Sequence, residues 1–156
     1  MSDPLSEDLH GFYLEDLAVG MTASYAKTIT ETDIVLFAGI SGDVNPVHLN
    51  HEFAAQTQFE GTIAHGMLTA SLISTVLGTK LPGPGGIYLK QDLSFRAPVK
   101  AGDTVVARVT ISGIDHEKQR IRLDCQCTVR QKTVLAGDAV IRVDRRDAVR
   151  SGADAG

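Results

Sequence analysis

Asp43 and His48 are the two side chains of this sequence whose types and spacing best suit proton transfer. They lie in the stretch FAGISGDVNPVH, separated by four residues that include an Asn45-Pro46 step. Pro46 pushes Asn45 out of the right-handed helical region, so a helix entering this stretch must end before Asn45. The turn that follows can bring a carboxylate and an imidazole together. Two such groups of different basicity can move protons to and from a substrate or a bound water.

A purely structural explanation of the same residues is also available. Gly42 and Asp43 are typical turn residues, and His48 can be a structural histidine whose ring nitrogens are satisfied by neighbours. Residue types alone favour this explanation over a catalytic one.

Helical patterns surround the Asp-His stretch. Thr30 and Asp33 resemble a capping box that opens a helix at residue 31. Asn50 can cap a short helix over residues 51–57. Residues 66–77 carry no charged side chain, so they predict a helix that is buried all round, and Gly78 and Pro82 supply its stop.

Alternating apolar and polar side chains predict strands elsewhere in the chain. These segments are residues 21–29, 86–99, 102–112, 120–130 and 133–143. The Gly137-Asp138 step predicts a β-bulge in the last of them. The fold class is therefore α+β, with one central apolar helix wrapped by a curved antiparallel sheet. We expect one domain over residues 11–144, with solvated tails at residues 1–10 and 145–156.

Composition excludes several classes of function. The chain has 156 residues, a formal net charge of -4 and no block of basic residues, so it shows no electrostatic footprint for nucleic acid. The first ten residues lack the basic and apolar regions of a secretory signal. The most apolar stretch, GMLTASLISTVLG, is too short to span a bilayer and carries four hydroxyl groups. We expect a cytoplasmic protein that does not bind membranes.

The cysteines and three of the histidines are expected to be structural or solvent-exposed. Cys125 and Cys127 are two residues apart on one strand, which favours reduced core thiols over a disulfide. The three histidines that we expect at the surface are His10, His51 and His116.

The stretch FAGISGDVNPVH, followed after five residues by Ala54, resembles the motif of the MaoC-like (R)-specific enoyl-CoA hydratases. That motif is an aromatic residue, a short spacer, Ser-Gly-Asp-x-Asn-Pro-aliphatic-His, five residues and a small residue, and every fixed position matches. The resemblance continues through FEGTIAHGMLTASLIS and LSFRAPVKAGDTV and covers about residues 12–143.

The resemblance implies a fold, an assembly and a reaction. The fold is the hot-dog fold, in which a long helix lies in a curved antiparallel sheet, and the assembly is a homodimer. The reaction is the reversible addition of water to a trans-2-enoyl-CoA, which gives an (R)-3-hydroxyacyl-CoA. No metal or other cofactor is implied, because CoA is part of the substrate.

The resemblance also assigns roles within the site. Asp43 and His48 correspond to the pair that activates the water, with Asp43 favoured as the main base. Gly66 corresponds to the glycine whose N–H stabilises the thioester oxygen, which suits an unpaired amide at a helix start. Three residues are expected to support them: His65 as an orienting or capping neighbour of Gly66, Asn45 as a turn residue or substrate contact, and Ser74.

Several alternatives stay open at this stage. Ser74 can instead be a buried hydroxyl bonded to a helix carbonyl. Lys90, Arg96 and Lys100 can meet CoA phosphates or simply be solvated. A hot-dog acyl-CoA thioesterase and a non-catalytic acyl-CoA-binding module are the competing functions, because the fold alone does not define the reaction. Acyl chain length and branching are not encoded in any motif.

Overall fold

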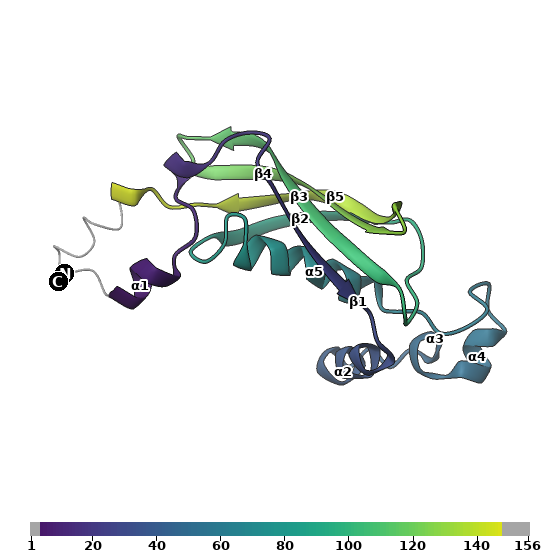
Figure 1. The fold of residues 1–156 in the computed structure, drawn as a ribbon. Coiled ribbons are helices and arrows are strands. Elements are labelled where there is room, and N and C mark those ends of the chain that lie inside the picture. Colours follow the sequence, from purple (N-terminus) through teal and green to yellow (C-terminus); the bar gives the residue numbers. More distant parts are fainter. Residues whose placement is uncertain (1–3, 148–156) are drawn as a thin grey trace.

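The segments with alternating side chains form an antiparallel sheet in the computed structural model, which describes residues 4–147 (Figure 1). Within these residues the strands are β1 (Thr22–Thr28), β2 (Ile87–Phe95), β3 (Thr104–Asp115), β4 (Arg120–Val129) and β5 (Lys132–Arg142). They form one sheet in the order β1-β3-β4-β5-β2. All the predicted strand segments are confirmed.

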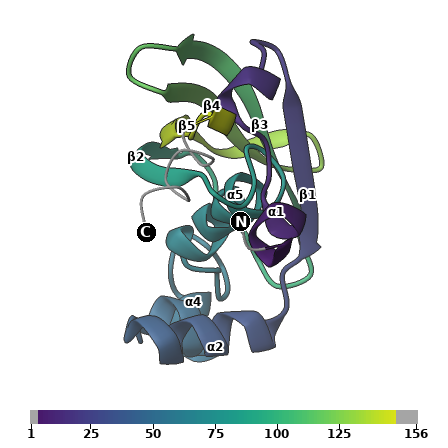
Figure 2. The same cartoon turned by 90° about the vertical axis from the view of Figure 1, so that its left-hand side faces the viewer.

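The helices pack on one side of this sheet and beyond one end of it (Figures 1 and 2). They are α1 (Pro4–Leu9), the 3-10 helix η1 (Leu14–Asp16), α2 (Glu31–Ser41), α3 (Pro46–Leu49), α4 (His51–Ala55) and α5 (Gly66–Thr79). The long helix α5 runs beneath the sheet, whereas α2, α3 and α4 form a small helical layer next to its first turn. The predicted α+β class is confirmed.

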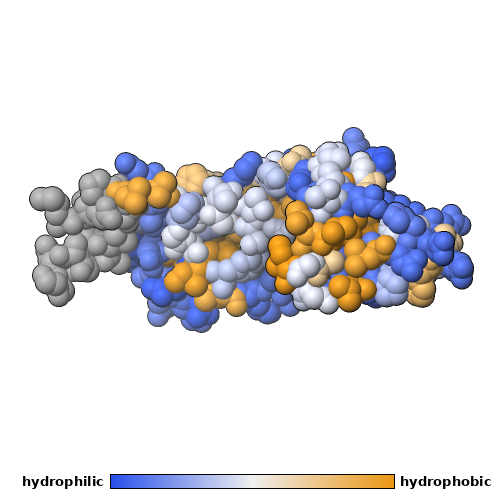
Figure 3. Space-filling model, turned by 90° about the horizontal axis from the view of Figure 1, so that it is seen from below, coloured by the Kyte–Doolittle hydropathy of each residue, from blue (hydrophilic) through white to orange (hydrophobic). Residues whose placement is uncertain are grey.

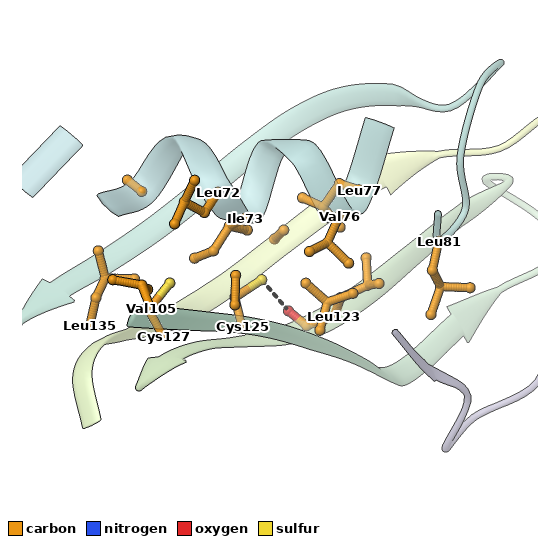
Figure 4. Close-up of a cluster of buried hydrophobic side chains, with 14 of the residues drawn as sticks. Leu72, Ile73, Val76, Leu77, Leu81, Val105, Leu123, Cys125, Cys127 and Leu135 are labelled. Carbon is orange, nitrogen blue, oxygen red and sulfur yellow. Dashed lines mark hydrogen bonds between the residues drawn. The ribbon is translucent and has the colours of Figure 1, made fainter. Parts of the chain in front are cut away.

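The core lies between α5 and the inner face of the sheet (Figure 4). Leu72, Ile73 and Val76 of α5 point toward β4, where Leu123 and both cysteines are buried. Each buried aliphatic side chain of this size stabilises the fold by roughly 1.5–3 kcal/mol relative to an exposed one. Both cysteines are free thiols, as predicted.

The expectation that α5 is buried all round is wrong for the chain on its own. The sheet covers only one side of the helix, so the opposite side, with Ser71, Ser74 and a 58% exposed Met67, faces outward. Viewed from below the sheet, apolar side chains gather on this face (Figure 3). Ile40 of α2 and Phe95 of β2 are also among the exposed apolar side chains.

The predicted bulge at Gly137 and Asp138 is also wrong. Both residues pair in continuous register with β4 and with β2, and the register shifts instead near Leu89 and Val134. The presence of glycine at position 137 has a steric explanation instead. A Cβ at this position would overlap the Asp92 carbonyl of β2, so glycine permits the close approach of the two strands.

Parts of the two predicted solvated tails are structured within the described residues. Residues 4–9 form α1, and the Arg146 guanidinium makes an ion pair with Asp16 and lies 4.4 Å from the ring centroid of Tyr13. Residues 1–3 and 148–156 of the predicted tails lie outside the described residues, and the domain boundaries stay a prediction. Between residues 4 and 147, none of the helices combines the length and apolarity that a membrane span requires.

Candidate active site

Asp43 sits at the end of α2, where the chain leaves the helix through a left-handed residue. The predicted capping box is present, because Thr30 Oγ1 accepts from the Asp33 N–H and Asp33 Oδ2 accepts from the Thr30 N–H. Gly42 ends the helix at φ 77°, a conformation that a side chain would strain. The Asp43 carboxylate therefore projects from a fixed corner and remains half exposed.

His48 is delivered by α3, the helix that begins at Pro46. Asn45 caps this helix, since its side-chain oxygen accepts from the Val47 N–H at 3.1 Å. Asp43 Oδ1 in turn accepts from the Asn45 N–H at 3.3 Å. The Asn45-Pro46 step thus ends the turn after α2 and begins α3. Asn45 has the structural role of a turn and capping residue, one of the two roles expected for it.

The two predicted groups face one another. Asp43 Oδ2 and His48 Nε2 are 4.0 Å apart, and the His48 side chain is only 9% exposed. His48 Nδ1 lies 2.8 Å from the Ile63 carbonyl oxygen. A carbonyl only accepts, so Nδ1 carries a proton, and in the neutral ring the lone pair would be on Nε2, the nitrogen nearer Asp43.

His65 lies behind this pair. It is 2% exposed, and its Nε2–H donates to the Asp43 carbonyl oxygen at 2.8 Å. Its ring stacks on the His48 ring with centroids 3.8 Å apart, and the Phe37 ring lies on it at 4.9 Å. Its Nδ1 has no hydrogen-bond partner among the residues that the structure describes.

Gly66 follows His65 directly and is the first residue of α5. The first amides of an α-helix have no intrahelical acceptor and carry the positive end of the helix dipole. Gly66 lines a cavity of about 540 Å³ together with Asp43 and His65, and apolar side chains make up most of the remaining wall. Asp43 and Gly66 therefore lie at one cavity, and His48 Nε2 is 4.0 Å from the Asp43 carboxylate.

Phe95, Phe59 and Ile63 also line this cavity, although sequence reasoning did not select them. Phe95 alternates with polar neighbours on β2, and that pattern indicated only a strand. A Cβ at Gly66 would lie 2.6 Å from Cε1 of Phe95. The paired-strand register, not any local motif, brings Phe95 to Gly66.

Ser74 is not brought into the cluster. Its side chain is exposed on α5, which rules out the alternative of a buried hydroxyl. It lines a neighbouring hollow of about 580 Å³ with Tyr88 and Leu89, and Met67 contributes to the walls of both hollows.

The remaining cations and histidines have separate positions. Lys90 pairs with Asp92 at 2.9 Å, Lys100 donates to the Phe59 carbonyl at 2.6 Å, and Arg96 lines the cavity that contains Gly66. His51 and His116 are exposed, as predicted. The prediction for His10 is wrong, because its ring is partly buried and stacks on Tyr13 at 4.0 Å.

The donor atoms of Asp43, His48 and His65 all lie within 4.8 Å of one another. Two imidazoles and a carboxylate form a donor set that transition metals accept. The two rings, however, stack with an interplanar angle of only 27°, so their in-plane lone pairs do not converge on one point. This geometry suits a hydrogen-bonded water better than a metal ion.

Fold and site together are those of a hot-dog protein with an acid–imidazole pair beside a cavity, and the comparisons with known proteins identify its family. The family model described as the MaoC like domain matches residues 18–134, and this chain belongs to that family of dehydratases. The chain is 52% identical over 141 residues to an (R)-specific enoyl-CoA hydratase of Rhodospirillum rubrum, with 90% of this chain and 98% of that protein covered. It is 49% identical over 140 residues to a 3-hydroxybutyryl-CoA dehydratase of Methylorubrum extorquens, covering 90% and 89% of the two chains.

A solved structure supports the fold assignment independently. The R-hydratase PhaJ1 from Pseudomonas aeruginosa superposes with a TM-score of 0.82 at 42% identity, and the match covers 87% of this chain and 88% of that one. The predicted hot-dog fold and the predicted family are both confirmed.

Proposed function

We propose that this chain is an (R)-specific enoyl-CoA hydratase, in which Asp43 and His48 hold and activate one water molecule. The chain is a hydro-lyase that adds water reversibly to a trans-2-enoyl-CoA. The observation that carries the mechanism is the 4.0 Å separation of Asp43 Oδ2 and His48 Nε2, with Asp43 lining the same cavity as Gly66. A water oxygen about 2.8 Å from each atom would see them at an angle of about 90°, which suits two hydrogen bonds.

The proton movements follow from the two groups. Water donates one hydrogen bond to the Asp43 carboxylate and one to the lone pair of His48 Nε2, so attack on the β-carbon transfers a proton to this pair. Asp43 is favoured as the main base, with His48 orienting the water and sharing the transfer. The α-carbon then takes a proton from the pair, so the C=C π bond is replaced by one C–O and one C–H bond.

Negative charge builds on the thioester oxygen during attack. The Gly66 N–H at the start of α5 is the proposed donor to this oxygen. Its lack of a side chain leaves space for the thioester beside Phe95. Asn45 and His65 support the pair through hydrogen bonds that hold the chain around it. Ser74 lines only the neighbouring hollow, so we give it no role in the water addition.

The test of this function is the product. Crotonyl-CoA incubated with the protein should lose its conjugated-enone absorbance without releasing free thiol, and chiral analysis should find the (R)-3-hydroxy product. Thiol release would indicate a thioesterase, and binding without turnover would indicate an acyl-CoA-binding module. Mainly (S) product would also contradict the proposal.

A homodimer is the proposed assembly. β2 lies at one edge of the described sheet, and Ile87, Leu89 and Phe95 on it are between 46% and 55% exposed. The uncovered side of α5 is adjacent through the hollow that Ser74 and Leu89 share. A second copy would cover both the strand edge and the apolar face. Light scattering should give twice the 16.7 kDa chain mass, and active protein at 16.7 kDa would reject the dimer.

The cytoplasm is the proposed location. It is the compartment in which the two free thiols, Cys125 and Cys127, stay reduced. The proposed partners are therefore an acyl-CoA substrate and a second copy of the chain, with no nucleic acid and no membrane.

A further inference from the structure

His65 contacts each part of the proposed machinery through a different kind of interaction. Its Nε2–H donates to the Asp43 carbonyl at 2.8 Å, its ring stacks on His48 at 3.8 Å, and its peptide bond leads into Gly66. The side chain is 2% exposed, so solvent does not compete for any of these contacts. One buried residue thus joins three groups: Asp43 in the turn after α2, His48 on α3 and Gly66 at the start of α5.

Phe37 extends this arrangement by one further ring. Its centroid lies 4.9 Å from that of His65 at an interplanar angle of 52°, and it also packs against the hydrophobic core. The His65 ring therefore contacts the rings of both Phe37 and His48. We refer to Phe37, His65 and His48 as the ring column. Aromatic pairs in such arrangements contribute about 0.5–1.5 kcal/mol each beyond the area they bury.

We infer that the ring column, through His65, sets the distance between Asp43 and His48, and that His65 and Phe37 are positioning residues of the hydration reaction. The inference rests on the function proposed above. The N–H of His65 fixes the backbone of Asp43, and its ring face fixes the plane of His48. The width of the proposed water site between Asp43 and His48 is therefore set by His65, a residue that the water does not touch.

The hydrogen-bond pattern of His65 supports a positioning role over proton transfer. Nε2 is committed to the Asp43 carbonyl, and Nδ1 is buried without a partner in the part of the chain that the structure describes. His65 lines the cavity, but neither nitrogen has a hydrogen-bond partner among the side chains of the pair. An unpaired buried acceptor costs about 1–3 kcal/mol, so a purely structural role would be served as well by an apolar ring without that nitrogen.

Two substitutions separate the two contacts. His65→Gln keeps an N–H donor at the distance of Nε2 but removes the ring, whereas His65→Phe keeps a ring and removes the donor. A displacement of about 1 Å at a reacting group can cost about 100-fold in rate. We expect each variant to lower kcat for crotonyl-CoA hydration about 10-fold or more with KM within about 3-fold. The matched control is His116→Gln, an exposed histidine, which should leave kcat unchanged.

The same substitution made in the Asp43→Asn enzyme distinguishes a positioning role from general destabilisation. If His65 acts through the Asp43–His48 pair, His65→Gln should lower kcat much less in an Asp43→Asn enzyme than in the wild type. An equal loss in both backgrounds, or unchanged kcat in folded His65→Gln and His65→Phe, would overturn the inference. If both His65 variants melt below the assay temperature, Phe37→Leu replaces them as the test of the ring column. Phe37→Leu should lower kcat about 10-fold or more in the wild type and much less in the Asp43→Asn enzyme.

The outcomes also separate this inference from the proposed function. If Asp43→Asn retains near-native kcat, the proposed mechanism fails. If Asp43→Asn is inactive while the His65 and Phe37 variants turn over normally, only the ring column fails.

Discussion

Gly66 and Phe95 are so close that a Cβ on residue 66 would lie 2.6 Å from Cε1 of the Phe95 ring. Real Cβ contacts are not this short, so either the ring or the start of α5 would have to move. The proposed oxyanion donor therefore has two separate reasons to be glycine: access for the thioester, and the ring that already occupies the neighbouring space.

This contact yields a first prediction. Gly66→Ala should lower kcat by about 100-fold, the amount typical of a displaced oxyanion donor. It should also lower the melting temperature, because overpacking costs about 1–3 kcal/mol. Adding Phe95→Leu should restore the melting temperature without restoring kcat. Hydration kinetics and thermal melts on the three variants check both effects, and full recovery of kcat in the double variant would show that Gly66 matters only for packing.

A second prediction concerns the pair itself. Asp43→Asn and His48→Gln should each lower kcat by about 10² to 10⁴ with little change in melting temperature, because positioned acid-base catalysis contributes about that much. The double variant should be little worse than the poorer single variant, since one water serves both groups. Steady-state hydration of crotonyl-CoA measures all three. A well-folded Asp43→Asn enzyme with native kcat would contradict the mechanism.

The N-caps of the two neighbouring helices α3 and α4 allow a third, matched comparison. Asn45 caps α3 through the Val47 N–H, and Asn50 caps α4 through the Phe53 N–H at 3.0 Å. Alanine at either position should destabilise the protein by about 1 kcal/mol. Only Asn45→Ala should also lower kcat, because only α3 carries His48. Similar kcat in the two variants would mean that the cap does not position the imidazole.

The buried thiols give a fourth prediction, on pH. Burial raises the pKa of Cys125 from its ordinary 9.0 to about 11 and that of Cys127 to about 12. The folded state thus holds these protons more tightly than the unfolded chain, so their contribution to stability is complete below pH 9 and declines as the pH rises toward 11 and 12. Denaturant unfolding across this range should show the decline, and it should be weaker in a Cys125→Ala/Cys127→Val variant. Iodoacetamide at pH 8 should leave the native thiols unmodified.

A fifth prediction follows from the stacking of His48 and His65. Because their in-plane lone pairs do not converge, dialysis against EDTA should leave kcat unchanged. Elemental analysis of the dialysed, active enzyme is the accompanying measurement. Loss of activity that Zn²⁺ or Fe²⁺ restores would contradict it.

Most local sequence signals predicted the structure correctly, with the Gly137-Asp138 step as an exception. The Thr30 capping box, the stop before Asn45 and the strand periodicities all act within a few residues, and all were predicted correctly. The meeting of Asp43 and His48 was also predictable, because only four residues separate them.

Contacts between distant segments could not be predicted in this way. The bond from His65 to Asp43 spans 22 residues, and Phe95 reaches Gly66 only because β2 pairs with β5. The uncovered face of α5 escaped prediction for a related reason. The helix is apolar on all sides, and its composition does not reveal which side a sheet will cover.

The strand order β1-β3-β4-β5-β2 has a consequence for how the protein folds. β3, β4 and β5 follow one another in sequence as antiparallel neighbours, so their short loops close at little entropic cost. β2 instead pairs with β5, although β3 and β4 lie between them in the sequence. This pairing must close a much longer loop, so it forms more slowly. We therefore expect a folding nucleus in the β3–β5 meander, with Phe95 reaching Gly66 only after β2 has joined the sheet. Refolding followed by hydrogen exchange and by activity together should show protection of the meander before the first turnover.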